Sequence, residues 1–234
     1  MTEERRGAPH THHLRVQRTA RYFTLGGGAG APRTLWFVIH GYGQLAADFV
    51  RYFGDLASSD SFVVAPEALN RFYLVSPNKT PARDRPVGAT WMTREDRISE
   101  IADYVEYLDA LYDDVAAEAH RAGARVNVIG FSQGTATAAR WLTHGTATAH
   151  RLVLWGGLLP PETDLSRGVT TFRGAELTYI LGSRDHYVDD AMLATEQARL
   201  RVAAIPHDVI RFDGGHVISR AAFARLIAAD FSAP

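Results

Sequence analysis

The residues from Val126 to Ala136 constrain the fold of this chain more than any other stretch. Residues 125–129 are rich in β-branched side chains and indicate a buried strand, and residues 135–142 fit an alanine-rich helix. Between them, residues 130–134 match G-x-S-x-G, in which a serine lies on a sharp strand-to-helix turn and flanking glycines leave room for the bent backbone. The alternative is an ordinary glycine-containing turn. The strand–turn–helix context favours a nucleophilic serine at Ser132.

The rest of the chain alternates between strand and helix patterns. Apolar runs predict strands at 34–39, 61–66, 125–129, 151–155, 177–181 and 208–212, and helices are predicted at 48–57, 135–142, 189–203 and 219–231. Strand character from His13 to Leu25, with a break near Arg18 to Ala20, predicts an antiparallel sheet edge. This order predicts an α/β fold with a mostly parallel central sheet and helices on both faces.

Two segments between these elements carry their own signals. Thr93 to Asp96 has the pattern of a capping box, and it opens a helix with apolar residues at intervals of three and four. That stripe consists of Ile98, Ile101, Val105, Leu108, Leu111 and Val115. Glu67 to Met92 is the least regular part, and its length predicts a lid or a binding loop at the edge of the site.

Composition excludes several classes of function. The 234 residues carry a net charge of −1, so no excess of basic residues supports nucleic-acid binding. There is no cysteine, which rules out disulfides and cysteine nucleophiles. No apolar run approaches the roughly 18 residues of a membrane span, and no secretory signal precedes the fold, so we expect a cytoplasmic protein without integral membrane association. The oligomeric state is unknown from sequence.

We expect residues 1–12 to form a flexible tail and residues 13–234 to form a single domain. His10, His12 and His13 lie at this boundary and suggest a metal site, but a metal needs fixed geometry and further ligands. We therefore predict no metal.

Two further reactive residues follow predicted strands. Asp185 follows the strand at 177–181, and His216 follows the strand at 208–212. The carboxyl ends of parallel strands meet at one edge of the sheet, so both would join Ser132 there. An imidazole, with an ordinary pKa of about 6.5, can activate a serine hydroxyl at neutral pH, and a carboxylate can orient that imidazole. The sequence thus predicts a Ser132–His216–Asp185 triad.

Each member of the predicted triad has rivals. His40, His186 and His207 are alternative bases, and Asp185 could instead cap the following helix. Asp189 and Asp190, which follow Tyr187 and Val188 in the chain, are available for that capping role.

Four motifs together resemble the phospholipase/carboxylesterase family of α/β-hydrolases, which includes acyl-protein thioesterases. They are His40-Gly41-Tyr42-Gly43, residues 130–134, residues 182–188 and Gly214-Gly215-His216. The resemblance implies an α/β-hydrolase fold with no large cap domain, acting on small-molecule acyl esters or thioesters, without a metal or organic cofactor. The backbone N–H groups of Tyr42 and Gln133 would form the oxyanion hole. One departure is Gln44, where family members often have aspartate.

Substrate identity does not follow from the resemblance. Candidate pocket residues are Trp91, Met92, Leu158, Leu159, Tyr187 and Val188, and each is equally consistent with ordinary packing. Arg94 and Arg97 could bind an anionic group or pair with Glu95 or Glu100. The leading prediction is a serine carboxylesterase. Alternatives are an acyltransferase or peptidase with the same triad, and a hydrolase-fold binding protein without useful turnover.

Overall fold

The computed structural model describes residues 10–27, 31–75, 81–121 and 123–230. Within these ranges the chain forms a seven-stranded sheet with strand order β1-β3-β2-β6-β7-β8-β9. The strands are β1 (Tyr22–Gly26), β2 (Thr34–Ile39), β3 (Ser61–Pro66), β6 (Arg125–Phe131), β7 (Arg151–Trp155), β8 (Glu176–Gly182) and β9 (His207–Phe212). All neighbouring pairs are parallel except β1 with β3. The predicted α/β fold is confirmed.

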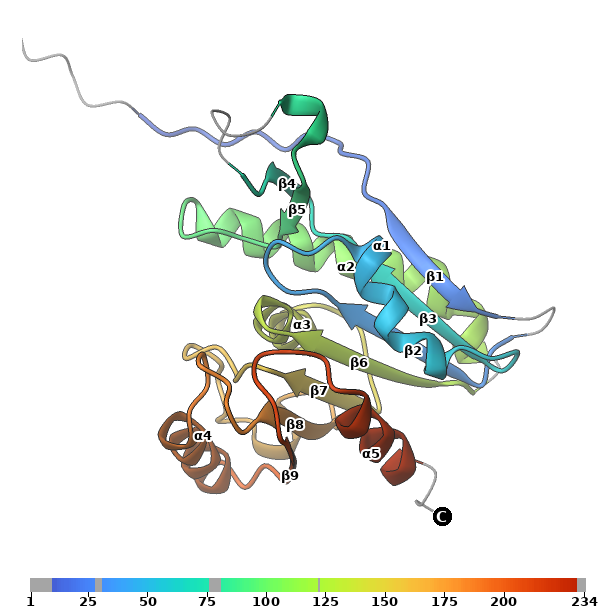
Figure 1. Cartoon of the computed structure of the whole chain (residues 1–234), viewed down its shortest axis with the longest axis vertical. Coiled ribbons are helices and arrows are strands. Elements are labelled where there is room, and N and C mark those ends of the chain that lie inside the picture. Colours follow the sequence, from blue (N-terminus) through green and yellow to red (C-terminus); the bar gives the residue numbers. More distant parts are fainter. Residues whose placement is uncertain (1–9, 28–30, 76–80, 122, 231–234) are drawn as a thin grey trace, which may run out of the picture.

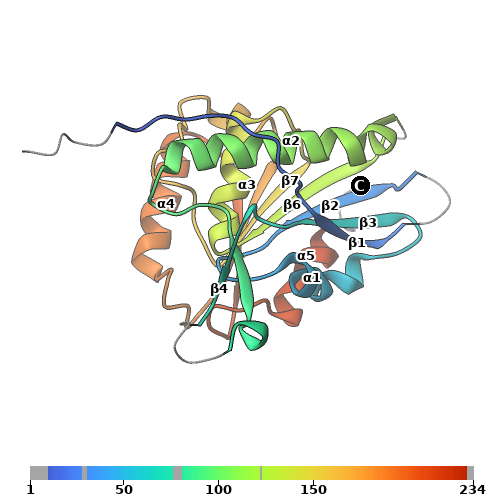
Figure 2. The same cartoon turned by 90° about the horizontal axis from the view of Figure 1, so that it is seen from above.

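Helices cover both faces of this sheet (Figure 2). One face packs against α2 (Arg97–Arg121), α3 (Gln133–His144) and α4 (Asp190–Val202). The other packs against α1 (Ala46–Phe49), the 3-10 helix η1 (Val50–Leu56) and α5 (Arg220–Asp230). Two separate apolar clusters result, because side chains alternate between the two faces along each strand.

The amino-terminal segment differs from its predicted form. Only Tyr22–Gly26 forms a strand, and residues 10–21 have no regular structure. This segment lies along α2 (Figure 2), where Arg15 bonds to Glu106 and the Tyr107 hydroxyl donates to the Arg21 carbonyl. Its contacts with α2 are made by side chains, so the segment is held without strand pairing.

Glu67 fastens several segments together just beyond β3. Its side chain is fully buried and accepts hydrogen bonds from Arg21 at 2.6 Å and from Arg71 at 2.6 Å. The backbone N–H of Ala46 also donates to it at 3.3 Å. A buried carboxylate is tolerated because two guanidinium groups and an amide satisfy it.

The long segment after Glu67 is more regular than the sequence indicates. It contains a two-stranded antiparallel sheet, β4 (Asn70–Tyr73) with β5 (Val87–Thr90), and a short 3-10 helix, η2 (Ala82–Asp84). Residues 76–80 lie outside the described residues. The hairpin packs on the loop after β2, because Gly43 N donates to the Ala89 carbonyl and Ala89 N donates to the Gln44 carbonyl.

The start of α2 also departs from its prediction. The helix begins at Arg97, preceded by Asp96 with a φ of 44°, so the expected capping box at Thr93 is wrong. Thr93 instead accepts from the N–H of Glu95 in a local turn. Ile98 lies in the first helical turn and is 81% exposed, whereas Leu108 is fully buried. The predicted apolar stripe therefore holds from Ile101 onward.

Candidate active site

Ser132 lies between β6 and α3 in a strained conformation. Its φ of 54° and ψ of −117° are unusual for a residue with a side chain. A Cβ at Gly130 would lie 2.3 Å from the Gly134 carbonyl oxygen, and a Cβ at Gly134 would lie 2.2 Å from the Ile39 oxygen. Both glycines are therefore required by close backbone approach. The strand before the turn is β6, labelled in Figure 1. It ends at Phe131, so the turn places Ser132 at the carboxyl end of the parallel strands.

Asp185 and His216 form a hydrogen-bonded pair at the same end of the sheet. Asp185 Oδ2 lies 2.8 Å from His216 Nδ1, and the Asp185 side chain is 1% exposed. The N–H of Tyr187 donates to the other carboxylate oxygen at 2.9 Å, which fixes the rotamer of Asp185. Among the described residues, the buried Nε2 atom of His216 has no hydrogen-bond partner.

The imidazole of His216 lies beside the Ser132 turn. Its ring centroid is 5.0 Å from that of Phe131, the residue before the serine. A Cβ at Gly156 would lie 3.0 Å from His216 Cε1, and the preceding carbonyl of Trp155 accepts the Ser132 N–H at 2.9 Å. The folded chain therefore gathers the three residues around the end of β7.

The loop after β2 also reaches the serine. A Cβ at Gly41 would lie 3.1 Å from Ser132 Cβ. Gln44 shapes this loop, because its side-chain oxygen accepts the Gly41 N–H at 2.8 Å. Tyr42, whose side chain is 61% exposed, lies in the bend between them. An amide thus organises this loop at the position where the resembled family often has a carboxylate.

The Gln133 side chain is a site feature that the sequence did not reveal. Its oxygen accepts the Trp91 N–H at 3.0 Å, and its amide nitrogen donates to the Met92 carbonyl at 2.8 Å. Thr90 Oγ1 lies 3.1 Å from both groups. The residue after Ser132 is therefore clamped to the segment between β5 and α2.

His40 is placed as a structural residue rather than a base. It is fully buried, its Nε2 accepts the Ala68 N–H at 3.1 Å, and its Nδ1 donates to the Gly41 carbonyl at 2.7 Å. Of the other rivals, His186 is exposed, and His207 begins β9 at the opposite end from the serine. Asp189 caps α4 by accepting the Met192 N–H, and Asp190 pairs with Arg211.

The burial of His40 predicts a dependence of stability on pH. Desolvation lowers the pKa of His40 to about 4, although its bond to Gly41 opposes that shift. The unfolded chain, with an ordinary histidine pKa near 6.5, then binds the proton more readily. The free energy of unfolding should therefore fall as the pH drops from about 6.5 to about 4, with a loss of about 2 kcal/mol at pH 5 from this residue.

Urea unfolding at pH 7.5 and pH 5 measures this effect. His40→Gln can keep both hydrogen bonds without titrating, so its stability should change less between the two pH values than that of the wild type. His144→Gln, at an exposed histidine, is the matched control and should behave as the wild type does. Equal pH dependence in the wild type and His40→Gln would contradict the assignment.

The six candidate pocket residues differ in burial. Trp91, Leu159 and Val188 are 2%, 4% and 5% exposed and belong to the main apolar cluster, which fits the packing alternative. Trp91 also donates its indole N–H to the His40 carbonyl. Met92 and Leu158 are half-buried against the same cluster. Tyr187 is 62% exposed, with its ring centroid 4.6 Å from that of His216.

Cavity volume does not locate this site. Surface cavities of about 710 Å³ and 590 Å³ lie elsewhere, and neither is lined by Ser132, Asp185 or His216. The larger lies between α4 and the segment around Leu165, and the smaller lies at the amino ends of β6 and β8. The hydrogen-bond geometry at the strand ends is the better indicator of chemistry.

Within the described ranges, no group of three or more histidine, cysteine or acidic side chains could hold a metal ion. No helix in those ranges is long and apolar enough to cross a membrane. Arg97 pairs with Glu162, rather than with the predicted Glu95 or Glu100.

Solved structures similar to this chain include an esterase and an acyl-protein thioesterase. Esterase PE8 is 21% identical, with a TM-score of 0.64 over 92% of this chain and 99% of that one. Acyl-protein thioesterase 2 of Zea mays is 16% identical, with a TM-score of 0.66 over 92% and 99%. SOBER1 of Arabidopsis thaliana is 19% identical, with a TM-score of 0.61 over 84% and 96%. These likenesses confirm the predicted α/β-hydrolase fold.

A match between this sequence and a protein family is more specific than these structural likenesses. No curated protein matches the chain. A family described as Serine hydrolase (FSH1) matches residues 37–224, which span the loop after β2, the Ser132 turn, Asp185 and His216. The prediction of a serine hydrolase is confirmed, and the chain belongs to the FSH1 serine hydrolase family.

Proposed function

We propose that this chain is a serine carboxylesterase that hydrolyses small acyl esters through an acyl-enzyme on Ser132. The observation that carries the proposal is the hydrogen bonding of His216, which decides which ring nitrogen carries the hydrogen. Its Nδ1 lies 2.8 Å from a carboxylate oxygen of Asp185, and a carboxylate can only accept. In the neutral ring the hydrogen is therefore on Nδ1, and the lone pair of the buried Nε2 is free to take the Ser132 proton.

The proposed reaction has two halves. Ser132 Oγ attacks the ester carbonyl carbon while its proton passes to His216 Nε2. The imidazolium then gives that proton to the departing alcohol oxygen, and the acyl group stays on Ser132. A water molecule, deprotonated by the same Nε2, attacks the acyl-enzyme, and the acid leaves as Ser132 recovers its proton.

The backbone N–H groups of Tyr42 and Gln133 are proposed to bind the oxyanion. Gln133 is the first residue of α3, where free amides and the helix dipole favour negative charge. The close approach of Gly41 to Ser132, and the bond from Gly41 to Gln44, support a fixed position for the Tyr42 amide. A single donor of this kind typically contributes roughly 3–4 kcal/mol to the barrier.

The substrate class is proposed to be uncharged esters, with thioesters as the second class. Exposed aromatic side chains flank the site, since the Tyr42 ring is 5.1 Å from that of Phe72 and Tyr187 contacts His216. The charges of Arg97 and Arg140 are already neutralised in part by Glu162. The surface around the serine therefore favours apolar groups over anions.

Two measurements test the proposal together. The purified chain should hydrolyse p-nitrophenyl esters in a series from acetyl to palmitoyl, and the profile will give the preferred acyl length. A fluorophosphonate should stop turnover, and peptide mapping should find the adduct on Ser132. An adduct on another residue, or turnover that persists after complete labelling of Ser132, would contradict the proposed mechanism.

A further inference from the structure

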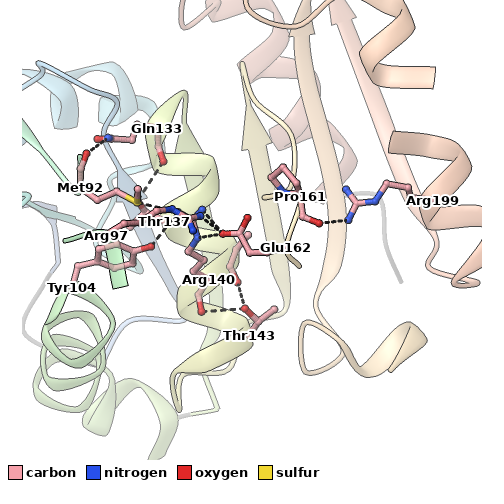
Figure 3. Close-up of polar contacts among 11 residues, drawn as sticks. Met92, Arg97, Tyr104, Gln133, Thr137, Arg140, Thr143, Pro161, Glu162 and Arg199 are labelled. Atoms are coloured by element: carbon pink, nitrogen blue, oxygen red, sulfur yellow. Dashed lines mark hydrogen bonds and ion pairs between the residues drawn. The ribbon is translucent and has the colours of Figure 1, made fainter. Parts of the chain in front are cut away.

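A charged cluster joins Arg140 of α3 to Glu162 and Arg97 (Figure 3). Arg140 donates from Nε at 3.0 Å and from Nη2 at 2.6 Å to a single oxygen of Glu162. Arg97, from the first turn of α2, donates to the same oxygen. The Arg140 side chain is 8% exposed, so this is a largely buried guanidinium held by one carboxylate.

The remaining nitrogen of the Arg140 guanidinium, Nη1, faces Met92 and Tyr104 (Figure 3). It lies 3.4 Å from Met92 Sδ and 3.4 Å from the Tyr104 hydroxyl. The carbonyl of the same Met92 accepts the Gln133 side-chain amide. Met92 is thus held to α3 at two points, once next to Ser132 and once two turns later.

Glu162 belongs to the segment that follows β7, on the opposite side of α3. This segment begins beside the site, because a Cβ at Gly157 would lie 2.3 Å from Thr135 Oγ1. Further along, Glu196 of α4 accepts the Leu159 N–H at 2.9 Å, and Arg199 donates to the Pro161 carbonyl at 3.3 Å. The segment is therefore held between α3 and α4.

The cluster is ionic at neutral pH. Burial opposes the charge on Glu162, but its hydrogen bonds, including those from the arginines, outweigh that effect and lower its pKa to about 2. Burial also opposes the charge on Arg140, and its contacts with Tyr104 and Glu162 outweigh that effect and raise its pKa. Removing the Glu162 charge would leave the largely buried Arg140 guanidinium without its counterion, whereas Glu162 is 42% exposed and would keep its pairing with Arg97.

From this geometry we propose that Arg140 is a positioning residue that fixes the spacing of the two segments flanking Ser132, and thereby sets the acyl length that the site accepts. The two segments are residues 90–92 and residues 157–162. A guanidinium suits this task because its planar fork binds a carboxylate and a second group at fixed angles, which an ammonium does not. The inference rests on the proposed esterase function.

Arg140→Lys tests the inference, because it keeps the charge and loses the fork. Without the fork, the two segments should be held less firmly and the space between them should widen. The preferred substrates should then shift towards esters with longer acyl chains. We expect the ratio of kcat/KM for the octanoyl ester to that for the acetyl ester to rise about tenfold, which is the size of effect typical of a changed apolar pocket. Turnover of the acetyl ester should change little, because its small acyl group does not extend along the flanking segments.

Glu162→Gln is the second variant, and it removes the charge while keeping the size of the partly exposed side chain. It should shift the ratio in the same direction, and the double variant should add little to Arg140→Lys, since both break one interaction. Amide hydrogen exchange should quicken in residues 90–92 and 157–162 of both variants. This readout does not depend on turnover.

The matched control is Glu176→Gln. Glu176 also pairs with a largely buried arginine, Arg151 at 2.8 Å, but at the amino ends of β7 and β8. It should leave the ester ratio within twofold of the wild type.

An unchanged ratio in Arg140→Lys, or an equal shift in Glu176→Gln, would overturn the inference. The proposed function would stand in either case if the fluorophosphonate still labels Ser132. Labelling elsewhere would contradict the proposed function instead, and the exchange rates would still report on the Arg140 contacts.

Discussion

Ser132→Ala should reduce the turnover of p-nitrophenyl esters by about a million-fold, the scale seen when an enzyme of this mechanism loses its nucleophile. The acyl-enzyme cannot form without Oγ, and only oxyanion binding remains. The fold should persist, because the Ser132 side chain makes no capping hydrogen bond to α3. Steady-state rates, with a thermal melt of both proteins, check the expectation.

The positive φ of Ser132 provides a further check on the same variant. Alanine and serine have similar costs at this backbone conformation, so a change in stability should be small. A variant that folds and retains turnover within tenfold of the wild type would exclude Ser132 as the nucleophile.

Asp185→Asn should lower kcat by about ten-thousand-fold. The asparagine amide would donate to His216 Nδ1, which puts the ring hydrogen on Nε2 and removes the lone pair that the serine needs. The Tyr187 N–H could still bond to the asparagine oxygen, so the local turn should survive. The pH-independent kcat for the best ester in the series is the quantity to measure.

Asp189→Asn is the matched control for this acid. Asp189 lies four residues away and caps α4 through the Met192 N–H at 2.7 Å. Asparagine is an equally good cap, so both kcat and stability should stay near wild-type values. If Asp189→Asn proved the more damaging change, the assignment of Asp185 would be wrong.

The backbone of the site was predictable because its signals are local. The Ser132 turn follows an apolar strand with glycines at fixed spacing, and Asp185 and His216 each follow a recognisable strand. Parallel strands bring such positions together without further information. The α/β fold followed from the same alternation of strand and helix.

The side-chain network was not predictable, because its members are far apart in sequence. Gln133 meets Trp91 and Met92 across more than forty residues, and Arg140 meets Glu162 across 22. A long polar side chain can bond to many different partners, and the sequence pattern does not show which of them it meets in the folded chain. The β4–β5 hairpin was missed for a different reason, since each strand is only four residues long and a long, proline-containing connection separates them.

The buried carboxylate of Glu67 has a practical consequence for altering this chain at its amino end. Arg21 supplies one of the two guanidinium groups that neutralise it, and the backbone N–H of Ala46, at the start of α1, donates a hydrogen bond to the same carboxylate. A deletion that removed Arg21 would leave a charge in the interior with half its counterions, close to the histidine that supports the loop after β2. Affinity tags and fusion partners are therefore best joined ahead of residue 10, and shortened versions should retain everything from Arg15 onward.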